Sequence, residues 1–304
     1  MEMMLRNMFQ SLGKSRSANK LAKKYGLKFG AARFVAGETI QQSIAAVRLL
    51  NQDGRVATLD HLGEFVFSEE EAKESANMCI QTLDAIAASG VTSNLSLKMT
   101  SLGLDISREL CLSNMKRILD TARLHGNFVR IDMEDYAHCQ ISLDIYRELR
   151  EQYDNVGIVI QAYLFRTEQD ICDLKALSAN LRLVKGAYKE SPEVAFPEKQ
   201  DVDNNYKKII EMHLNNGHYT AVASHDEAII NFTKQFVSSH GISLDQFEFQ
   251  MLYGICEDLQ KQLVREGYRV RVYVPYGVDW FGYFMRRLAE RPANVWFVLK
   301  NMFK

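Results

Sequence analysis

The sequence is poor in proline and has no long hydrophobic run. Its 304 residues include only 4 prolines, and 25% of them are charged, a composition that excludes collagen-like chains and argues against disorder. No apolar run approaches the roughly 20 residues that a membrane-spanning helix needs. The hydrophobic content of 47% instead predicts an ample core, in one large domain or two small ones.

Cysteine is scarce and shows no pairing pattern. The five cysteines are odd in number, lie far apart in the sequence and form no Cys-x-x-Cys motif. Disulfide frameworks are usually even-numbered, and zinc sites usually have closely spaced ligands. We therefore expect reduced thiols in a cytoplasmic protein.

The charges nearly balance, but they are distributed unevenly. A net charge of −1 gives no global attraction to nucleic acid, so we expect no nucleic-acid partner. Residues 1–37 nevertheless carry eight Lys and Arg side chains and only one acid, Glu2. Two interpretations stay open: a solvated pair of helices, or an amphipathic arm that makes peripheral contact with anionic lipid at the inner face of the membrane.

Short apolar runs alternate with stretches of helical periodicity along the rest of the chain. Eight runs are predicted as strands: Ala57–Leu62, Leu95–Thr100, Phe128–Glu134, Gly157–Leu164, Leu181–Tyr188, Thr220–His225, Phe247–Gly254 and Val270–Gly277. The helical stretches between them are Glu69–Ala88, Arg108–Leu124, Ser142–Gln152, Glu168–Leu177, Asn205–Asn215, Glu227–Ser238 and Glu257–Glu266. Helix N-caps are expected at Asp105, Ser142, Thr167 and Asp226.

Eight strand–helix units in about 250 residues predict an α/β fold of the (β/α)8 TIM-barrel type. We assign residues 46–304 to this barrel and residues 1–45 to an N-terminal helical arm outside it. A doubly wound sheet is the competing fold, and it is disfavoured because no Gly-x-Gly-x-x-Gly motif follows the first strand.

The functional site of such a barrel lies at the carboxyl ends of the strands. The residues expected there offer few carboxylates and only two isolated histidines, His61 and His225, so we expect no metal site. They are instead rich in cations and tyrosines: Lys98, Arg182, Lys185, Arg286 and Arg287, with Tyr188, Tyr273 and Tyr283. This set predicts binding of anions with a flat or apolar body, such as a phosphorylated cofactor and a small carboxylate substrate.

The last helix carries an arginine pair on one face. Tyr283, Arg286, Arg287 and Glu290 have the spacing i, i+3, i+4, i+7, which places them together on a helix. Taken alone, this is an ordinary solvated polar face opposite an apolar one. Because the helix directly follows the eighth strand, its polar face is predicted to close over the barrel mouth and bind a carboxylate.

Lys98 allows a different enzyme class. A lysine on a barrel strand can form a Schiff base with a carbonyl substrate, as in lyases and aldolases. A neighbouring carboxylate such as Asp132 favours the charged lysine, so a charged anchor is the preferred role for Lys98. A barrel that binds a ligand or partner without catalysis is the third alternative.

Five segments in this order resemble the monofunctional bacterial proline dehydrogenases, over residues 40 to 304. They are Leu95–Gly103 (LSLKMTSLG), Arg130–Glu134 (RIDME), Arg182–Tyr188 (RLVKGAY), Tyr273–Gly277 (YVPYG) and Tyr283–Glu290 (YFMRRLAE). The resemblance implies a distorted (β/α)8 barrel with the last helix over its mouth. It also implies the cofactor FAD and the oxidation of L-proline to Δ1-pyrroline-5-carboxylate, with hydride transfer to flavin N5.

The resemblance also implies roles for individual residues. The substrate residues would be Lys98, Tyr188, Leu252, Tyr273, Tyr283, Arg286, Arg287 and Glu290, with Asp132 beside Lys98 in the pocket. Arg182 would sit near flavin N5 and favour the anionic reduced flavin, so that Asp132 and Arg182 are the expected catalytic residues. The remaining flavin contacts would be Met133, Gln161, Lys185, Gly186, Ala187, Lys199, Ser224 and His225.

The resemblance further implies partners for the reaction. A quinone is the expected electron acceptor, and functional coupling to a pyrroline-5-carboxylate dehydrogenase is expected because that enzyme class would consume the product.

Overall fold

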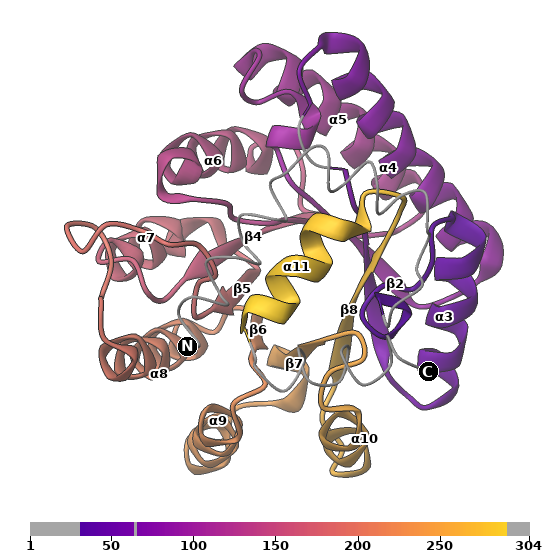
Figure 1. Ribbon diagram of the computed structural model, residues 1–304. Helices are drawn as coiled ribbons and strands as arrows, with labels where there is room; N and C mark the ends of the chain where they lie inside the picture. The colour runs from indigo at the N-terminus through magenta and orange to yellow at the C-terminus, as the bar shows by residue number, and fades with distance from the viewer. Residues whose placement is uncertain (1–30, 64–65, 291–304) are drawn as a thin grey trace.

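Eight parallel strands form a closed barrel in the computed structural model, which describes residues 31–63 and 66–290, with side chains as far as Arg287. Each strand pairs with the next along the chain, and β8 closes the barrel on β1 (Figure 1). The strands are β1 (Val56–His61), β2 (Ser93–Leu97), β3 (Val129–Ile131), β4 (Val156–Gln161), β5 (Leu181–Val184), β6 (Thr220–Ala223), β7 (Phe247–Leu252) and β8 (Val270–Tyr276). The predicted (β/α)8 fold is confirmed.

Helices surround the barrel, and one crosses its opening (Figure 1). The α-helices are α3 (Ile40–Gln52), α4 (Glu69–Ser89), α5 (Arg108–Leu124), α6 (Tyr136–Arg150), α7 (Thr167–Leu174), α8 (Lys199–Asn215), α9 (Glu227–Ser239), α10 (Glu257–Arg265) and α11 (Trp280–Glu290). Short 3-10 helices are η1 (Ala31–Arg33), η2 (Thr100–Leu102), η3 (Lys175–Leu177) and η4 (Leu244–Gln246). Helix α3 packs outside the barrel against β1 and β8. The proposed boundary at residue 45 falls inside α3, and the division into two domains stays a prediction.

Two of the expected N-caps were placed wrongly. Ser107, not Asp105, caps α5 by accepting from the amide of Leu110. Asp135 caps α6, so that helix begins at Tyr136 and the expected cap Ser142 is buried inside it. Ser142 is a buried polar residue within α6, and the sequence alone does not distinguish such a residue from an N-cap.

The other two expected caps lie at helix starts. Asp226 caps α9 by accepting from the amide of Ala228, as predicted. Thr167 is the first residue of α7 and has a different partner: its hydroxyl donates to the Gln161 carbonyl at 2.5 Å. Helix α8 begins at Lys199, six residues before the predicted start.

The barrel interior is polar, whereas its outer surface packs apolar residues against the helices. Arg271 of β8 donates to Glu248 of β7 at 2.7 Å, and both side chains are buried. Arg130 of β3 donates through Nη1 to the carbonyl of Asn180 at 2.6 Å. Many barrels fill this space with branched aliphatic side chains; here charged groups satisfy one another inside the barrel.

A separate apolar cluster fixes α11 over the barrel mouth. Phe34 and Val35, which follow η1, pack with Trp280, Phe284 and Met285 of α11. The rings of Phe34 and Phe284 have centroids 6.1 Å apart. Burying an aromatic side chain of this size contributes about 1.5–3 kcal/mol, so this cluster holds the helix in place from its apolar side.

The segment before α3 is also tied to the barrel by hydrogen bonds. The amide of Ala36 donates to the carbonyl of Pro275 at 2.9 Å, and that of Gly277 donates to the carbonyl of Gly37 at 3.0 Å. Residues 31–37 therefore form a strap across the end of β8, where α11 begins.

Candidate active site

The carboxyl ends of the strands open beneath α11. Figure 1 shows this helix lying across the centre of the barrel opening. Three residues, Gly277 to Asp279, separate the end of β8 from the start of α11. The chain has little freedom over so short a connection, and this places the polar side of α11 near the strand ends.

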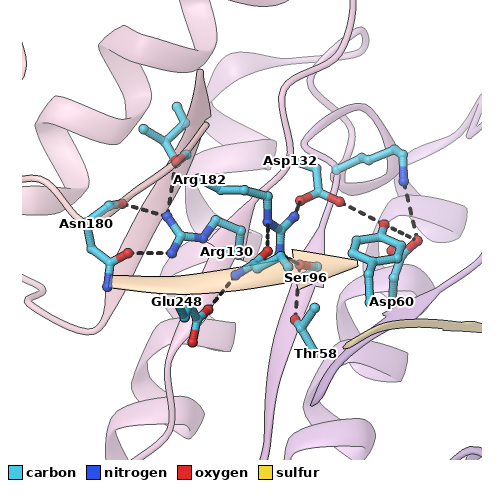
Figure 2. A network of polar contacts seen from close by, with 12 residues as sticks. Thr58, Asp60, Ser96, Arg130, Asp132, Asn180, Arg182 and Glu248 are labelled. Carbon is cyan, nitrogen blue, oxygen red and sulfur yellow. Dashed lines mark hydrogen bonds and ion pairs between the residues drawn. The ribbon is translucent and has the colours of Figure 1, made fainter. Parts of the chain in front are cut away.

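Arg182 of β5 lies at the centre of a polar network under the mouth (Figure 2). Its Nη1 donates to Oδ1 of Asp132 at 2.5 Å, its Nε to Oε1 of Gln250 at 2.6 Å, and its Nη2 to the hydroxyl of Ser96 at 2.9 Å. The guanidinium also lies over the ring of Tyr273, 5.4 Å from the centroid. Four strands thus fix one buried cation in a single orientation.

Two carboxylates converge on the hydroxyl of Tyr273. Oδ2 of Asp132 is 2.8 Å from it, and Oδ2 of Asp60, at the end of β1, is 2.6 Å from it. Lys98 donates to the same Asp60 oxygen at 3.5 Å. Asp132, which we expect beside Lys98, binds Arg182 and Tyr273, and the Tyr273 hydroxyl links it to Asp60, a carboxyl partner of Lys98.

The arginine pair occupies the described part of α11. The Arg287 guanidinium lies 5.1 Å from the centroid of the Tyr283 ring, one turn earlier. Tyr283 is buried, and Arg286 and Arg287 are half-buried. We call Tyr283, Arg286 and Arg287 the carboxylate clamp. Glu290 belongs to α11, but its side chain lies outside the described residues, so its predicted role cannot be placed here.

Two further predicted wall residues lie in different surroundings. Leu252 of β7 is in register with Tyr273 of β8 and packs against the apolar cluster of α11. Tyr188 lies in the loop after β5 and is 37% exposed, so closure around a bound molecule would be needed to bury it.

The two lysines assigned to the phosphate groups lie together. Lys185 donates to Asp203 and, at 2.7 Å, to Asp226. Lys199 also donates to Asp203. The hydrogen bond from Lys185 holds the pKa of Asp226 below its usual value. The predicted cations therefore come with two carboxylates that balance their charge, which the sequence reasoning did not include.

Gly186 permits a close approach between backbone and ring. Its φ of +114° lies in the region that favours glycine, and a Cβ at this position would overlap the ring of Tyr163. Gly186 is one of the expected flavin contacts, and its close neighbour in the structure is the Tyr163 ring. Ala187, the next residue, is exposed.

The end of β4 offers an acceptor for a flat cofactor. Gln161 is 3% exposed, and its Nε2 donates to the carbonyl of Glu134 at 2.9 Å. Within the described residues its Oε1 is buried and accepts no hydrogen bond. Met133 is buried close by, after β3. A buried acceptor without a donor is unusual, and it fits the hydrogen-bonding edge of an isoalloxazine ring.

The end of β6 contributes Ser224 and His225. The Ser224 hydroxyl accepts from the amide of Asp226 at 3.1 Å, and Nε2 of His225 accepts from the amide of Leu252 at 3.0 Å. Both residues directly precede Asp226 in the sequence, and Asp226 in turn binds Lys185. The part of the chain that the structure describes contains no group of three metal-ligating side chains.

Two residues of the site were missed by sequence reasoning. Asp60 was placed at a strand end but given no role, and Asp203 lies inside α8. The position of Asp60 directly before His61 at the end of the first strand was the available signal. For Asp203, the spacing i, i+4 from Lys199 on α8 was a local signal, but its contact with Lys185, which follows β5, depends on the fold.

Fold and site together define a (β/α)8 barrel with a buried network of charged and tyrosine side chains at the carboxyl ends of its strands and with α11 across its opening. A family profile described as proline dehydrogenase matches residues 43–300. Proline dehydrogenase 2 of Bacillus subtilis strain 168 is 55% identical over 99% of this chain and 100% of its own length. The Deinococcus radiodurans proline dehydrogenase is 47% identical over 90% of each chain.

Solved structures agree with this assignment. Proline utilization A from Bdellovibrio bacteriovorus, inactivated by N-propargylglycine, superposes with a TM-score of 0.81 at 28% identity. The match covers 86% of this chain and 32% of that much longer protein.

The chain belongs to the proline dehydrogenase family, which comprises flavin-dependent oxidoreductases of proline catabolism acting on a CH–NH group. The resemblance drawn from the five sequence motifs is confirmed. Among the described residues, no helix is both long and apolar enough to cross a bilayer.

Proposed function

We propose that this chain oxidises L-proline to Δ1-pyrroline-5-carboxylate with FAD as the cofactor. The observation that carries the proposal is the position of the carboxylate clamp on α11, above the network of Arg182, Asp132 and Tyr273. A small amino acid bound between them would have its carboxylate toward the cations and its ring against the tyrosines. Hydride transfer is the chemistry that FAD supplies when bound.

The clamp and Lys98 bind the substrate carboxylate in this proposal. Arg286 and Arg287 present adjacent planar guanidiniums, which suit bidentate binding of a carboxylate. With Lys98 on the opposite wall, the carboxylate is held from two sides, and this fixes the direction of the C–N bond to be oxidised. Such positioning is worth several kcal/mol of activation free energy.

Tyr273, Tyr283 and Leu252 form the apolar surface for the five-membered ring. Tyr273 and Leu252 are neighbours on adjacent strands, and Tyr283 descends from the helix above. Tyr188 closes the exposed side once a ligand is bound. A wall of this kind excludes water and favours a compact ring over a longer polar side chain.

Arg182 holds a positive charge at the place where negative charge develops during reduction. Its three hydrogen bonds keep the guanidinium in one orientation before the reaction, so little reorganisation is needed. Asp132 fixes it from the substrate side. Gln161, Met133 and Gly186 would contact the flavin ring region, and Lys185, Lys199, Ser224 and His225 its ribityl and phosphate part.

Steady-state turnover tests the proposal. Purified protein supplied with L-proline and a dye electron acceptor should reduce the dye and release a product with the chemistry of a cyclic imine. If the flavin-containing protein oxidises other secondary amino acids but reduces no dye with L-proline, the proposed substrate is wrong.

The Schiff-base lyase alternative is not favoured. The Nζ of Lys98 donates to Oδ2 of Asp60, a contact that suits an ammonium donor better than a free nucleophilic amine. Borohydride trapping with a carbonyl substrate should therefore leave Lys98 unmodified. Turnover of L-proline in the test above would exclude a non-catalytic barrel.

We also propose a quinone as electron acceptor and functional coupling to a pyrroline-5-carboxylate dehydrogenase. The bifunctional PutA proteins of Escherichia coli and Salmonella typhimurium, 28% identical over 93% of this chain, support the coupling. Activity with a water-soluble quinone would test the acceptor. Faster conversion of L-proline through both steps when the two enzymes are mixed would test the coupling.

Peripheral membrane contact through residues 1–37 is the last proposal. Most of this segment lies outside the described residues, and its charge is the support. Liposomes of anionic lipid should sediment the full chain more than a chain that starts at residue 38. Equal sedimentation of the two would contradict the proposal.

A further inference from the structure

Asp60 is the most deeply buried carboxyl group at the barrel mouth. Its side chain is 2% exposed, against 12% for Asp132. The hydroxyl of Tyr273 lies between the two acids, 2.6 Å from Asp60 and 2.8 Å from Asp132. Figure 2 shows the line of polar contacts that runs from Arg182 through Asp132 to Asp60.

Two full hydrogen bonds among three oxygen atoms need two protons, because one proton shared between two acceptors gives only a weaker three-centre bond. The Tyr273 hydroxyl supplies one, because burial and both carboxylates raise its pKa well above the usual value. An ionised carboxylate has no proton to give. A second proton on one of the two acids makes both short contacts full hydrogen bonds and avoids two buried negative charges around one hydroxyl.

The surroundings decide which acid carries it. Asp132 accepts a charged hydrogen bond from Arg182 at 2.5 Å, which stabilises its ionised form. Asp60 has its lysine at 3.5 Å and almost no exposure to water. Burial raises the pKa of Asp60, Lys98 opposes that shift, and the charge of Asp132 adds to it. The proton therefore belongs to Asp60.

We propose that Asp60 is a positioning residue of the substrate site and acts as a neutral carboxylic acid. It donates its proton to Tyr273, so that the tyrosine hydroxyl is directed onto Asp132 and the ring wall is fixed. A neutral Asp60 also does not compete with the substrate carboxylate for Lys98. This role rests on the proposed function, because it assigns Tyr273 and Lys98 to the proline pocket.

Loss of the proton should weaken substrate binding. An ionised Asp60 would attract Lys98 and would repel Asp132 across the tyrosine, so both the anchor and the wall would be disturbed. Because the pKa of Asp60 is raised, the proton is present at low pH and leaves as the pH rises through the pKa of the folded protein. The titratable groups that face Asp60 are Cys79 of α4, Lys98 after β2, Asp132 after β3, and Tyr273 and Tyr276 of β8.

Infrared spectroscopy of the flavin-loaded enzyme tests the protonation state without turnover. The wild type should show the C=O stretch of a buried carboxylic acid, and labelling with [4-13C]aspartate should shift that band. The label separates an aspartic acid from Glu134, whose pKa burial also raises. The band should vanish in Asp60→Asn and persist in Asp132→Asn, which is the matched isosteric control.

A band absent from the wild type, insensitive to labelled aspartate, or lost in Asp132→Asn but kept in Asp60→Asn would overturn the proposal. The labelled wild type needs no variant to fold. Failure of the proposed function would appear differently, as absence of L-proline turnover with the infrared band intact.

The dependence of KM on pH tests the positioning role. In the wild type, KM for L-proline should rise by up to about tenfold for each pH unit above the pKa of Asp60, the slope of a one-proton linkage. Asp60→Asn, which has no proton to lose, should abolish this rise. A rise of equal size in Asp60→Asn would contradict the role even if the acid band is assigned to Asp60.

Discussion

Nη1 of Arg182 on β5 donates to Oδ1 of Asp132, the residue that follows β3, at 2.5 Å. This hydrogen bond links the residue assigned to the flavin with the residue assigned to the substrate pocket. Through Tyr273 the link continues to Asp60 on β1. The residues assigned to the substrate and to the cofactor thus belong to one buried network. A substitution at one end of it should therefore also affect binding at the other end.

Arg287→Met should remove half of the carboxylate clamp. The cost is expected to be on the order of 2–5 kcal/mol in kcat/KM for L-proline, the range for truncating one member of a desolvated charge pair. Arg265→Met, on the exposed end of α10, is the matched control and should leave kcat/KM near the wild-type value. Wild-type kcat/KM in Arg287→Met would rule out the clamp.

Gly186→Ala should reduce both stability and flavin content. The new Cβ would overlap the Tyr163 ring, and the backbone would be held at a φ of +114°. Gly217→Ala also places an alanine at a positive φ, +77°, but has no atom within 4 Å of the Cβ. Overpacking should make Gly186→Ala less stable than this control by about 1–3 kcal/mol, measured by urea unfolding. Equal losses of stability in the two variants would show that the Tyr163 ring moves aside at no cost, and this would contradict the prediction.

His213 should make the fold less stable in mild acid. Burial lowers the pKa of its imidazole from 6.5 to about 4, so between these values the unfolded chain binds a proton that the folded protein does not. Stability should fall as the pH drops through this window, by up to about 3 kcal/mol in total. Urea midpoints of the wild type should therefore decrease from pH 7 to pH 5 more than those of His213→Leu. Parallel slopes for the two proteins would contradict this assignment.

The rate should increase with pH in the neutral range. Hydride loss needs the free amine of proline, and most proline at neutral pH carries a protonated amine. If the free amine is the form that binds, kcat/KM should rise as the pH increases from about 6, until ionisation of Asp60 raises KM. A kcat/KM independent of pH between about 6 and 9 would count against binding of the free amine.

The barrel could be predicted from sequence because each strand–helix unit is a local pattern. Strands such as Leu181–Val184 and caps such as Asp226 are encoded within a few residues. The arginine pair on α11 was also visible, since residues at i, i+3 and i+4 share a helix face. The first residues of the helices were predicted less accurately, because a buried polar residue such as Ser142 resembles an N-cap.

The parts that escaped prediction depend on contacts between distant segments. Asp60 meets Tyr273 across 213 residues of sequence, and only closure of β1 on β8 brings them together. The strap at residues 31–37 reaches α11 in the same way. Charge balance at Lys185 by Asp203 and Asp226 likewise requires three separate elements to meet.

Anaerobic addition of L-proline to the purified protein tests the central claim most directly. The protein should be yellow, with the absorption bands of an oxidised flavin, and L-proline should bleach those bands within seconds to minutes. R287M should need higher L-proline concentrations for the same extent of bleaching. A flavin spectrum that stays unchanged with L-proline, or a protein that binds no flavin, would contradict the account.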